Sequence, residues 1–162
     1  NGPPGAPKEL ILARTAATDL VKFSSWEFYT AEGWKKDFRK PVTLLRNLAT
    51  EFSVTRVGGD EPYALILSES GLSRDIVLSL AKAPEGPWET PKPIFTVTDE
   101  PTSTTALFYA GKAHPAMSEE PCELVITYVV NSTDFWELSR NAELYRPRFL
   151  KFRLPGFPST KP

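Results

Sequence analysis

Cysteine is nearly absent from this chain, and long apolar runs are missing altogether. Cys122 is the single cysteine among 162 residues, so no disulfide can form within the chain. An odd cysteine in a secreted protein can pair with another chain, but cysteine is among the most often buried residues, and a buried thiol is the favoured interpretation. No apolar run approaches the roughly 18 residues that cross a bilayer, so a membrane partner is not expected.

The chain also lacks an excess of charge of either sign and lacks the common catalytic signatures. Its 19 basic and 20 acidic residues leave a net charge of −1, which gives no electrostatic reason to expect a nucleic acid as partner. There is no glycine-rich phosphate loop, CxxC pair, HExxH or GxSxG motif. His114 is the single histidine, with no second histidine or close acidic pair beside it, so no metal site is predicted.

The first residues carry neither an initiator methionine nor the character of a signal peptide. The chain begins Asn-Gly-Pro-Pro-Gly, which we interpret as a processed terminus or a cleavage point. Asn131-Ser132-Thr133 forms an N-glycosylation sequon. Together with the tryptophan and tyrosine content and the missing methionine, the sequon favours a secreted, extracellular protein.

Proline and glycine, by contrast, are plentiful and evenly spread. The 16 prolines and 9 glycines separate short apolar runs, a pattern typical of many short strands joined by turns. Residues 134–142 are expected to form a short helical turn, and no long amphipathic helix is predicted. The sequence therefore predicts an all-β fold.

A blade-like unit recurs along the chain. Gly33-Trp34 is followed by Pro41-Val42, and Gly86-Pro87-Trp88 is followed by Pro93-Ile94. A second series pairs residues 51–57 and 63–68 with residues 108–116 and 123–128. Several short strands in a unit of this length are typical of a β-propeller blade. Because propellers close with about four blades or more, this chain is expected to supply two to three blades of a ring.

The repeats divide residues 1–162 into parts of one partial β-propeller domain. We expect the end of one blade at about 9–45, a full blade at about 50–98, most of a further blade at about 106–154, and a tail at 155–162. A second polypeptide, either a cleaved N-terminal half or another chain, is expected to complete the ring. The innermost strands, 51–57 and 107–116, would then line the central channel.

Polar residues on the innermost strands are the first candidates for chemistry. Glu51 could act as a general acid or substrate anchor, or could be an ordinary ion-paired strand end. Lys112 and His114 lie two apart and share one face of an extended strand. His114 could donate to a sugar hydroxyl or tune a carboxylate, and a structural histidine bonded to backbone carbonyls is an equally good interpretation.

Arg146 and Trp26 are the candidates for substrate binding outside those strands. Arg146 and Arg148 flank a proline, and a guanidinium can fork onto a carboxylate or phosphate, although an ion pair between blades is favoured. Trp26 and Trp136 could stack on sugars. Trp34 and Trp88 occupy equivalent places in the repeat, so packing explains them better.

Several motifs occur in a familiar order: Glu51-Phe52-Ser53-Val54, Gly86-Pro87-Trp88, the run Tyr-Ala-Gly-Lys-Ala-His-Pro at 109–115, and Val-Ile-Thr-Tyr through Asn-Ser at 125–132. Residues 26–150 thereby resemble the C-terminal half of a five-bladed β-propeller family of secreted bacterial and fungal proteins. That family is related to arabinanase-type glycoside hydrolases, and some members are endo-D-arabinanases.

The resemblance implies a glycan-binding funnel at the ring axis with acid/base carboxylates around it. Glu51 and His114 would be catalytic, with Lys112, Trp26 and Arg146 binding substrate, no metal ligand and no required cofactor beyond a possible axial ion. The family's Asp-rich N-terminal motifs have no counterpart here, so a second carboxylate must come from elsewhere. The predicted function is a glycoside hydrolase, or half of one, with a polysaccharide ligand. Alternatives are a non-catalytic carbohydrate-binding propeller and a protein-interaction propeller. In this motif Asn131 is expected to be structural, not a glycan carrier.

Overall fold

The chain folds into short antiparallel strands, as the sequence predicts. The computed structural model describes residues 7–57, 62–98, 105–120 and 122–155. Within them lie twelve strands in four sheets, with one short α-helix and three 3₁₀ turns. The terminus at 1–5 and residues 156–162 of the expected tail lie outside the described residues.

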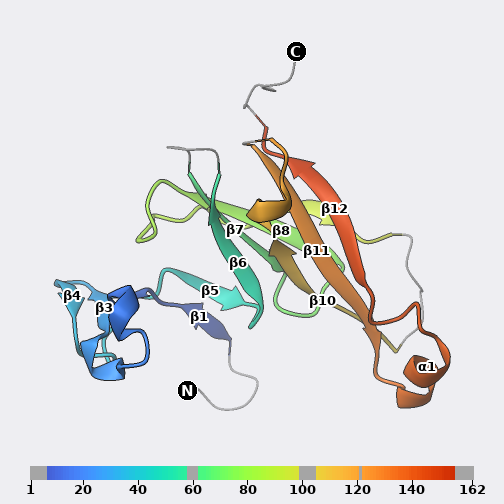
Figure 1. Cartoon of the computed structure of the whole chain (residues 1–162), viewed down its shortest axis with the longest axis horizontal. Helices are drawn as coiled ribbons and strands as arrows, with labels where there is room; N and C mark the ends of the chain where they lie inside the picture. The colour runs from blue at the N-terminus through green and yellow to red at the C-terminus, as the bar shows by residue number, and fades with distance from the viewer. Residues whose placement is uncertain (1–6, 58–61, 99–104, 121, 156–162) are drawn as a thin grey trace.

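The N-terminal part contains two small sheets. β1 (Lys8–Leu10) pairs with β5 (Leu45–Leu48), while β2 (Ala13–Arg14), β3 (Glu27–Thr30) and β4 (Gly33–Lys35) form a three-stranded sheet. Residues 15–25, between β2 and β3, hold two 3₁₀ turns, Ala17–Asp19 and Phe23–Ser25. This part lies at one end of the molecule (Figure 1).

The central sheet is a four-stranded meander. β6 (Phe52–Arg56), β7 (Tyr63–Ser68), β8 (Asp75–Ala81) and β9 (Lys92–Thr96) pair in chain order. All four strands lie within residues 50–98, for which the sequence predicts a set of short strands. β7 is buried from Ala64 to Ser68, as its unbroken apolar run predicts, because both faces of the sheet are covered.

The C-terminal sheet has three strands and carries the α-helix. β10 (Ala106–Ala113) pairs with β11 (Glu123–Ser132), which pairs with β12 (Pro147–Arg153). The helix α1 (Phe135–Arg140) lies between β11 and β12, within the predicted helical turn. It begins at Asp134, whose carboxylate accepts the backbone N–H of Trp136 at 2.8 Å, a standard N-cap.

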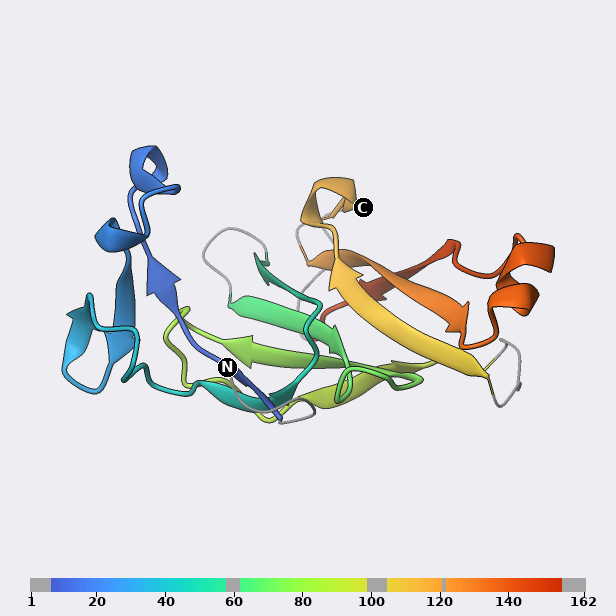
Figure 2. The ribbon, with the colours of Figure 1, turned by 90° about the horizontal axis from the view of Figure 1, so that it is seen from below.

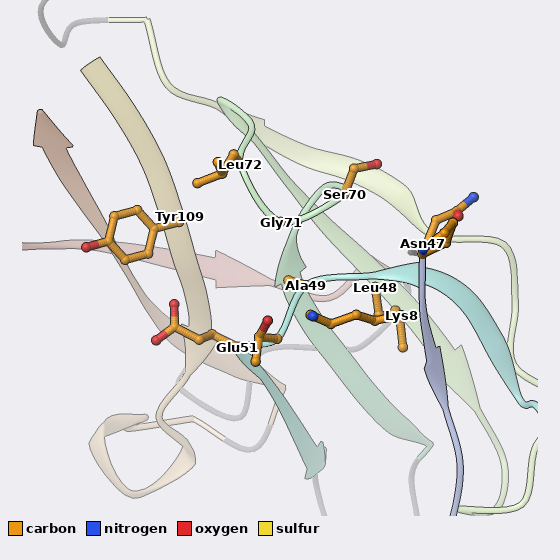
Figure 3. Close-up of a pocket in the computed structure, with 11 residues that line it drawn as sticks. Lys8, Asn47, Leu48, Ala49, Glu51, Ser70, Gly71, Leu72 and Tyr109 are labelled. Carbon is orange, nitrogen blue, oxygen red and sulfur yellow. The ribbon is translucent and has the colours of Figure 1, made fainter. Parts of the chain in front are cut away.

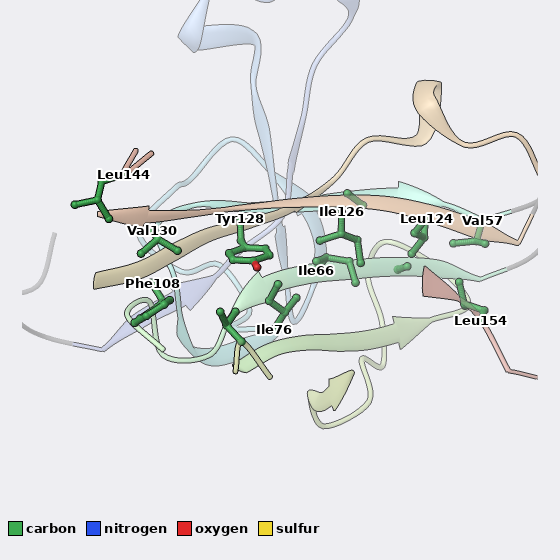
Figure 4. Packing of buried hydrophobic residues seen from close by; sticks show 13 residues of the cluster. Val57, Ile66, Ile76, Phe108, Leu124, Ile126, Tyr128, Val130, Leu144 and Leu154 are labelled. Carbon is green, nitrogen blue, oxygen red and sulfur yellow. The ribbon is translucent and has the colours of Figure 1, made fainter. Parts of the chain in front are cut away.

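The central and C-terminal sheets pack face to face. The main cluster lies between them, with Ile66 and Ile76 on one side and Leu124, Ile126 and Val130 on the other, all almost fully buried (Figure 4). Burial of each such side chain stabilises the fold by about 1.5–3 kcal/mol. Figure 2 shows the sheets following one another along the long axis of the molecule.

Backbone donors on β10 also tie the two sheets together. The N–H of Gly111 donates to Ser68 Oγ at 3.1 Å, and the N–H of Ala113 donates to Ser53 Oγ at 2.7 Å. β10 therefore lies beside β6 and β7. Closure into a propeller ring and the blade limits given above stay predictions. No helix within the described ranges is long and apolar enough to cross a membrane.

Candidate functional site

A β-bulge in β10 directs two polar side chains to the same side. Tyr109 pairs with Val129 and Lys112 pairs with Thr127, so three steps along β10 match two along β11. The extra residue is accommodated at Ala110, whose φ is 60°. On a regular strand, residues three apart point to opposite faces, whereas this bulge places Tyr109 and Lys112 on the same face.

A second bulge lies opposite, where β5 meets β1. Lys8 pairs with Leu48 and the next residue, Glu9, pairs with Arg46. Asn47 is therefore the extra residue, and its φ is also 60°. Left-handed backbone at a residue other than glycine costs free energy and gathers at functional sites.

A pocket of about 470 Å³ lies between these two bulges. Figure 3 shows the carboxylate of Glu51 extending toward the ring of Tyr109, while the ammonium of Lys8 points into the same space from the opposite wall. Glu51 comes from the connection between β5 and β6. The pocket is lined by Pro7, Lys8, Asn47, Leu48, Ala49, Thr50, Glu51, Ser70, Gly71, Leu72 and Tyr109.

Left-handed backbone is concentrated around this pocket. The four residues other than glycine with positive φ in the described part of the chain are Asn47, Ser70, Ala110 and Tyr145. Asn47 and Ser70 line the pocket. Ala110 follows Tyr109 in the chain, and Tyr145 hydrogen-bonds with the Tyr109 phenol. This clustering favours a functional origin for the strain.

The Tyr109 phenol has a fixed orientation. Asn131 Oδ1 accepts the N–H of Ser132 at 2.8 Å, which leaves Asn131 Nδ2 to donate to the Tyr109 oxygen at 3.0 Å. Burial raises the pKa of Tyr109, the hydrogen bond from Asn131 opposes that rise, and Tyr145 and Glu51 add to it. Tyr109 therefore remains a neutral phenol at neutral pH.

Glu51 and Lys112 form the charged part of the site. Lys112 Nζ lies 3.9 Å from Glu51 Oε1, with 39% and 44% of the two side chains exposed. A pair so open to water is weak, so the Glu51 carboxylate is free to exchange this partner for a ligand. The structure thus brings together two of the five predicted site residues.

His114 lies on the same face as Lys112, as predicted, but does not line the pocket. Its Nε2 is 2.7 Å from the Thr127 hydroxyl, and Thr127 is the strand partner of Lys112. His114 is half-buried. The structure gives it a side-chain partner, not the backbone carbonyl partner considered above, and its catalytic role stays a prediction.

Trp26 and Arg146 are not among the residues that line this pocket. Trp26 donates to the carbonyl of Leu20 at 3.2 Å and packs near Phe23 in the N-terminal part. Arg146 forms a 2.6 Å ion pair with Glu143 three residues earlier, in the exposed loop before β12. Trp34 packs against Tyr29. Trp88 packs against a smaller buried cluster, which consists of Leu48, Ala49, Leu65, Leu67 and Val77.

Two further predictions concern the thiol and metals. Cys122 is half-buried and packs against the main cluster. Among the described residues no group of three or more histidine, cysteine, aspartate or glutamate side chains is placed to hold a metal ion.

Sequence reasoning missed Tyr109, Asn47 and Lys8 as site residues. Tyr109 stands in the motif that carries the resemblance, but its direction depends on a bulge that is defined only against β11. Asn47 had one available signal, since asparagine tolerates left-handed backbone better than most residues.

The fold and site define an all-β protein of small antiparallel sheets with a strained polar pocket where the sheets meet. The chain belongs to the family described as domain of unknown function DUF5005, whose model matches residues 5–154. No protein with a curated description matches it.

A solved structure gives further information about the class of protein. The chain is similar to the crystal structure, at 2.80 Å resolution, of a "putative hydrolase" from Bacteroides ovatus, with a TM-score of 0.68 and 27% sequence identity. The match covers 88% of this chain and 39% of the other. The chain thus spans well under half the length of that protein.

Proposed function

We propose that this chain forms part of a β-propeller glycoside hydrolase and that the pocket at Glu51 binds the glycan. One observation carries the proposal: Glu51, from the connection between β5 and β6, and Tyr109, from β10, line the same pocket. The wall of this pocket includes left-handed backbone at Asn47 and Ser70. The similarity to a hydrolase supports the reaction class. The sequence resemblance to arabinanase-type propellers supports the glycan.

The position of Glu51 supports a role as the catalytic carboxylate. Its side chain is half-exposed at the pocket, where a ligand can reach it, and its ion pair with Lys112 is weak. Tyr109 and Asn47 supply neutral hydrogen-bonding groups of the kind that orient sugar hydroxyls. Glu51 would act as acid/base or as the group that anchors the substrate.

A second carboxylate is needed for the usual glycosidase mechanism. Glu51 is the one acidic residue among the described residues that line the pocket. We infer that the second carboxylate comes from a second polypeptide, or a further part of the protein, that completes the ring. If it does not, the same pocket fits the alternative function, carbohydrate binding without catalysis.

Exposed aromatic side chains support a partner that completes the fold. In the N-terminal part Phe23, Phe28 and Phe38 lie within ring-contact distance of one another, and Phe23 and Phe38 are 61% and 57% exposed. Exposed apolar clusters of this kind mark interaction surfaces. Extracellular location, proposed from composition, would suit a polysaccharide substrate.

The test is incubation of the full-length protein with a panel of polysaccharides that includes D-arabinan, with release of reducing ends and direct binding both measured. Hydrolysis of one polysaccharide supports the proposal. Binding without hydrolysis favours the alternative. If no polysaccharide of the panel is bound or hydrolysed, that result would contradict both functions.

A further inference from the structure

We propose that the pocket recognises an anionic sugar residue, with Lys8 as the group that binds its carboxylate or sulfate. This inference rests on the proposed function and narrows its substrate class. Three features of the pocket support this inference: the placement of Lys8, the pairing of the charges around Lys8, and the Tyr109 hydroxyl on the facing wall.

Lys8 lies directly beside the bulge at Asn47. Lys8 pairs with Leu48, while Glu9 pairs with Arg46, so the extra residue is on β5 and β1 continues without interruption. Lys8 lines the pocket, and Figure 3 shows its side chain lying along Leu48 with the ammonium pointing toward the side of Glu51. A bulge with left-handed backbone beside a pocket is a feature of functional sites.

The acidic groups nearest to Lys8 already have other partners. Glu9 binds Arg46 and accepts a hydrogen bond from the Thr43 hydroxyl. Glu51 pairs with Lys112. Lys8 itself forms no ion pair with any residue that the structure describes, so its charge faces the pocket unneutralised.

The described charged side chains in and beside the pocket leave one positive charge in excess. Lys8 and Glu51 line the pocket, and Lys112, which does not line it, lies 3.9 Å from Glu51 and supplies that carboxylate with a counter-ion. Charge of one sign in a concave site attracts ligands of the opposite sign. A lysine ammonium binds an anionic oxygen as a point charge, without the fork geometry of arginine, so carboxylate and sulfate share this chemistry.

The facing wall is consistent with the same ligand. Tyr109 is a neutral phenol whose oxygen accepts from Asn131. A neutral hydroxyl opposite an ammonium can hydrogen-bond with a ring hydroxyl without adding negative charge. A uronic acid or sulfated sugar satisfies both walls.

The test is calorimetric titration of the full-length protein with three probes: trigalacturonic acid, its methyl ester, and a sulfated galactose trisaccharide. The first two share the same sugar backbone, and the ester replaces each carboxylate with a neutral methyl ester group. We expect at least one anionic probe to bind at least about tenfold more tightly than the ester, since a hydrogen bond to a charged group is worth about one such factor or more. The sulfated probe distinguishes the two sources of the anion.

Lys8→Met retains most of the apolar stem and removes the charge. It should abolish the preference for the anionic probe while leaving binding of the ester within about twofold. Lys82→Met, at an exposed lysine that does not line the pocket, is the matched control and should change neither. Equal affinity for acid and ester, or an unchanged preference in Lys8→Met, would overturn the inference even if neutral glycans are hydrolysed. Failure of every probe to bind would also overturn it, whereas the proposed function is judged separately on the polysaccharide panel.

Discussion

Asn131 donates its amide N–H to the phenol oxygen of Tyr109 at 3.0 Å, across the pairing of β10 with β11. The contact gives Asn131 a structural role at the edge of the candidate site. It also makes the ionisation of Tyr109 a direct report on the geometry of the pocket wall.

The first prediction concerns the titration of Tyr109. The pKa of this phenol is raised above its ordinary value of 10.0, mainly by burial. Phenolate absorbance near 295 nm in the wild type minus Tyr109→Phe should therefore reveal one tyrosine that ionises later than the ordinary value. Asn131→Leu should raise the pKa of Tyr109 further, because the lost hydrogen bond lowers it.

The same shift has a consequence for stability. A group whose pKa is raised by folding contributes stability that is full below its unfolded value, near pH 10, and is lost as pH rises through the folded value. Tyr109→Phe should therefore be less sensitive than the wild type to pH in that alkaline range, as measured by chemical denaturation. An identical alkaline profile in both proteins would contradict the shift.

The second prediction concerns Glu51. Glu51→Gln keeps the shape of the side chain but removes the carboxylate, so hydrolysis by the full-length protein should be abolished. The melting temperature should change little, because Glu51 is half-exposed and its ion pair is weak. Glu32→Gln, whose side chain is 84% exposed on the hairpin of β3 and β4, is the control. Unchanged turnover in Glu51→Gln would remove Glu51 from the mechanism.

The third prediction tests the bulge in β10. A Cβ on Gly111 would lie 2.9 Å from the backbone nitrogen of Ser68 and 3.0 Å from the carbonyl carbon of Leu67, so β10 would be pushed away from β7. Gly111→Ala should lower the free energy of unfolding by about 1–3 kcal/mol, measured by urea denaturation of the full-length protein.

Substitution of the preceding residue, Ala110, should have the opposite effect on the free energy of unfolding. Ala110 has a φ of 60°, a conformation that glycine adopts without steric cost. Ala110→Gly should therefore be neutral or slightly stabilising. Equal destabilisation by both substitutions would show that the bulge does not have the described geometry.

The fourth prediction concerns the sequon. Asn131 uses both ends of its amide, donating to Tyr109 and accepting from Ser132, so an attached glycan would have to break the contact with Tyr109. Protein secreted from a eukaryotic host should carry no glycan on the peptide that contains Asn131, by mass spectrometry. High occupancy at Asn131 would contradict the structural role.

The fifth prediction concerns residues 1–162 expressed alone. Exposed Phe23 and Phe38, together with unpaired outer strands such as β9 and β12, should make this fragment prone to aggregation. Light scattering and size-exclusion chromatography would measure this. A monodisperse monomer that melts cooperatively would argue against the need for a partner.

Local features of the fold could be predicted well from the sequence. The four strands of the central sheet follow from alternating or unbroken apolar runs between turn residues, and the helical turn follows from Asp134 ahead of it. These features depend on neighbouring residues, which is why a single sequence reveals them. Ring closure depends on contacts beyond the chain, and it stays a prediction.

The candidate site was predicted only in part. Glu51 and Lys112 were found because each belongs to an expected innermost strand. Tyr109 was missed because a bulge in β10 aims it, and Lys8 because it lies beside a bulge in the partner strand β5. A bulge is a relation between two strands, which a single sequence does not show. Trp26 and Arg146 were chosen for residue type, and the structure instead pairs them with near neighbours in the chain, Leu20 and Glu143.

The most direct test of the proposed site is a crystal structure of the full-length Glu51→Gln protein with an oligosaccharide product of its best substrate. The account predicts sugar density in the pocket, with ring oxygens within hydrogen-bond distance of residue 51 and Tyr109. Sugar bound at another location, with this pocket empty, would contradict it.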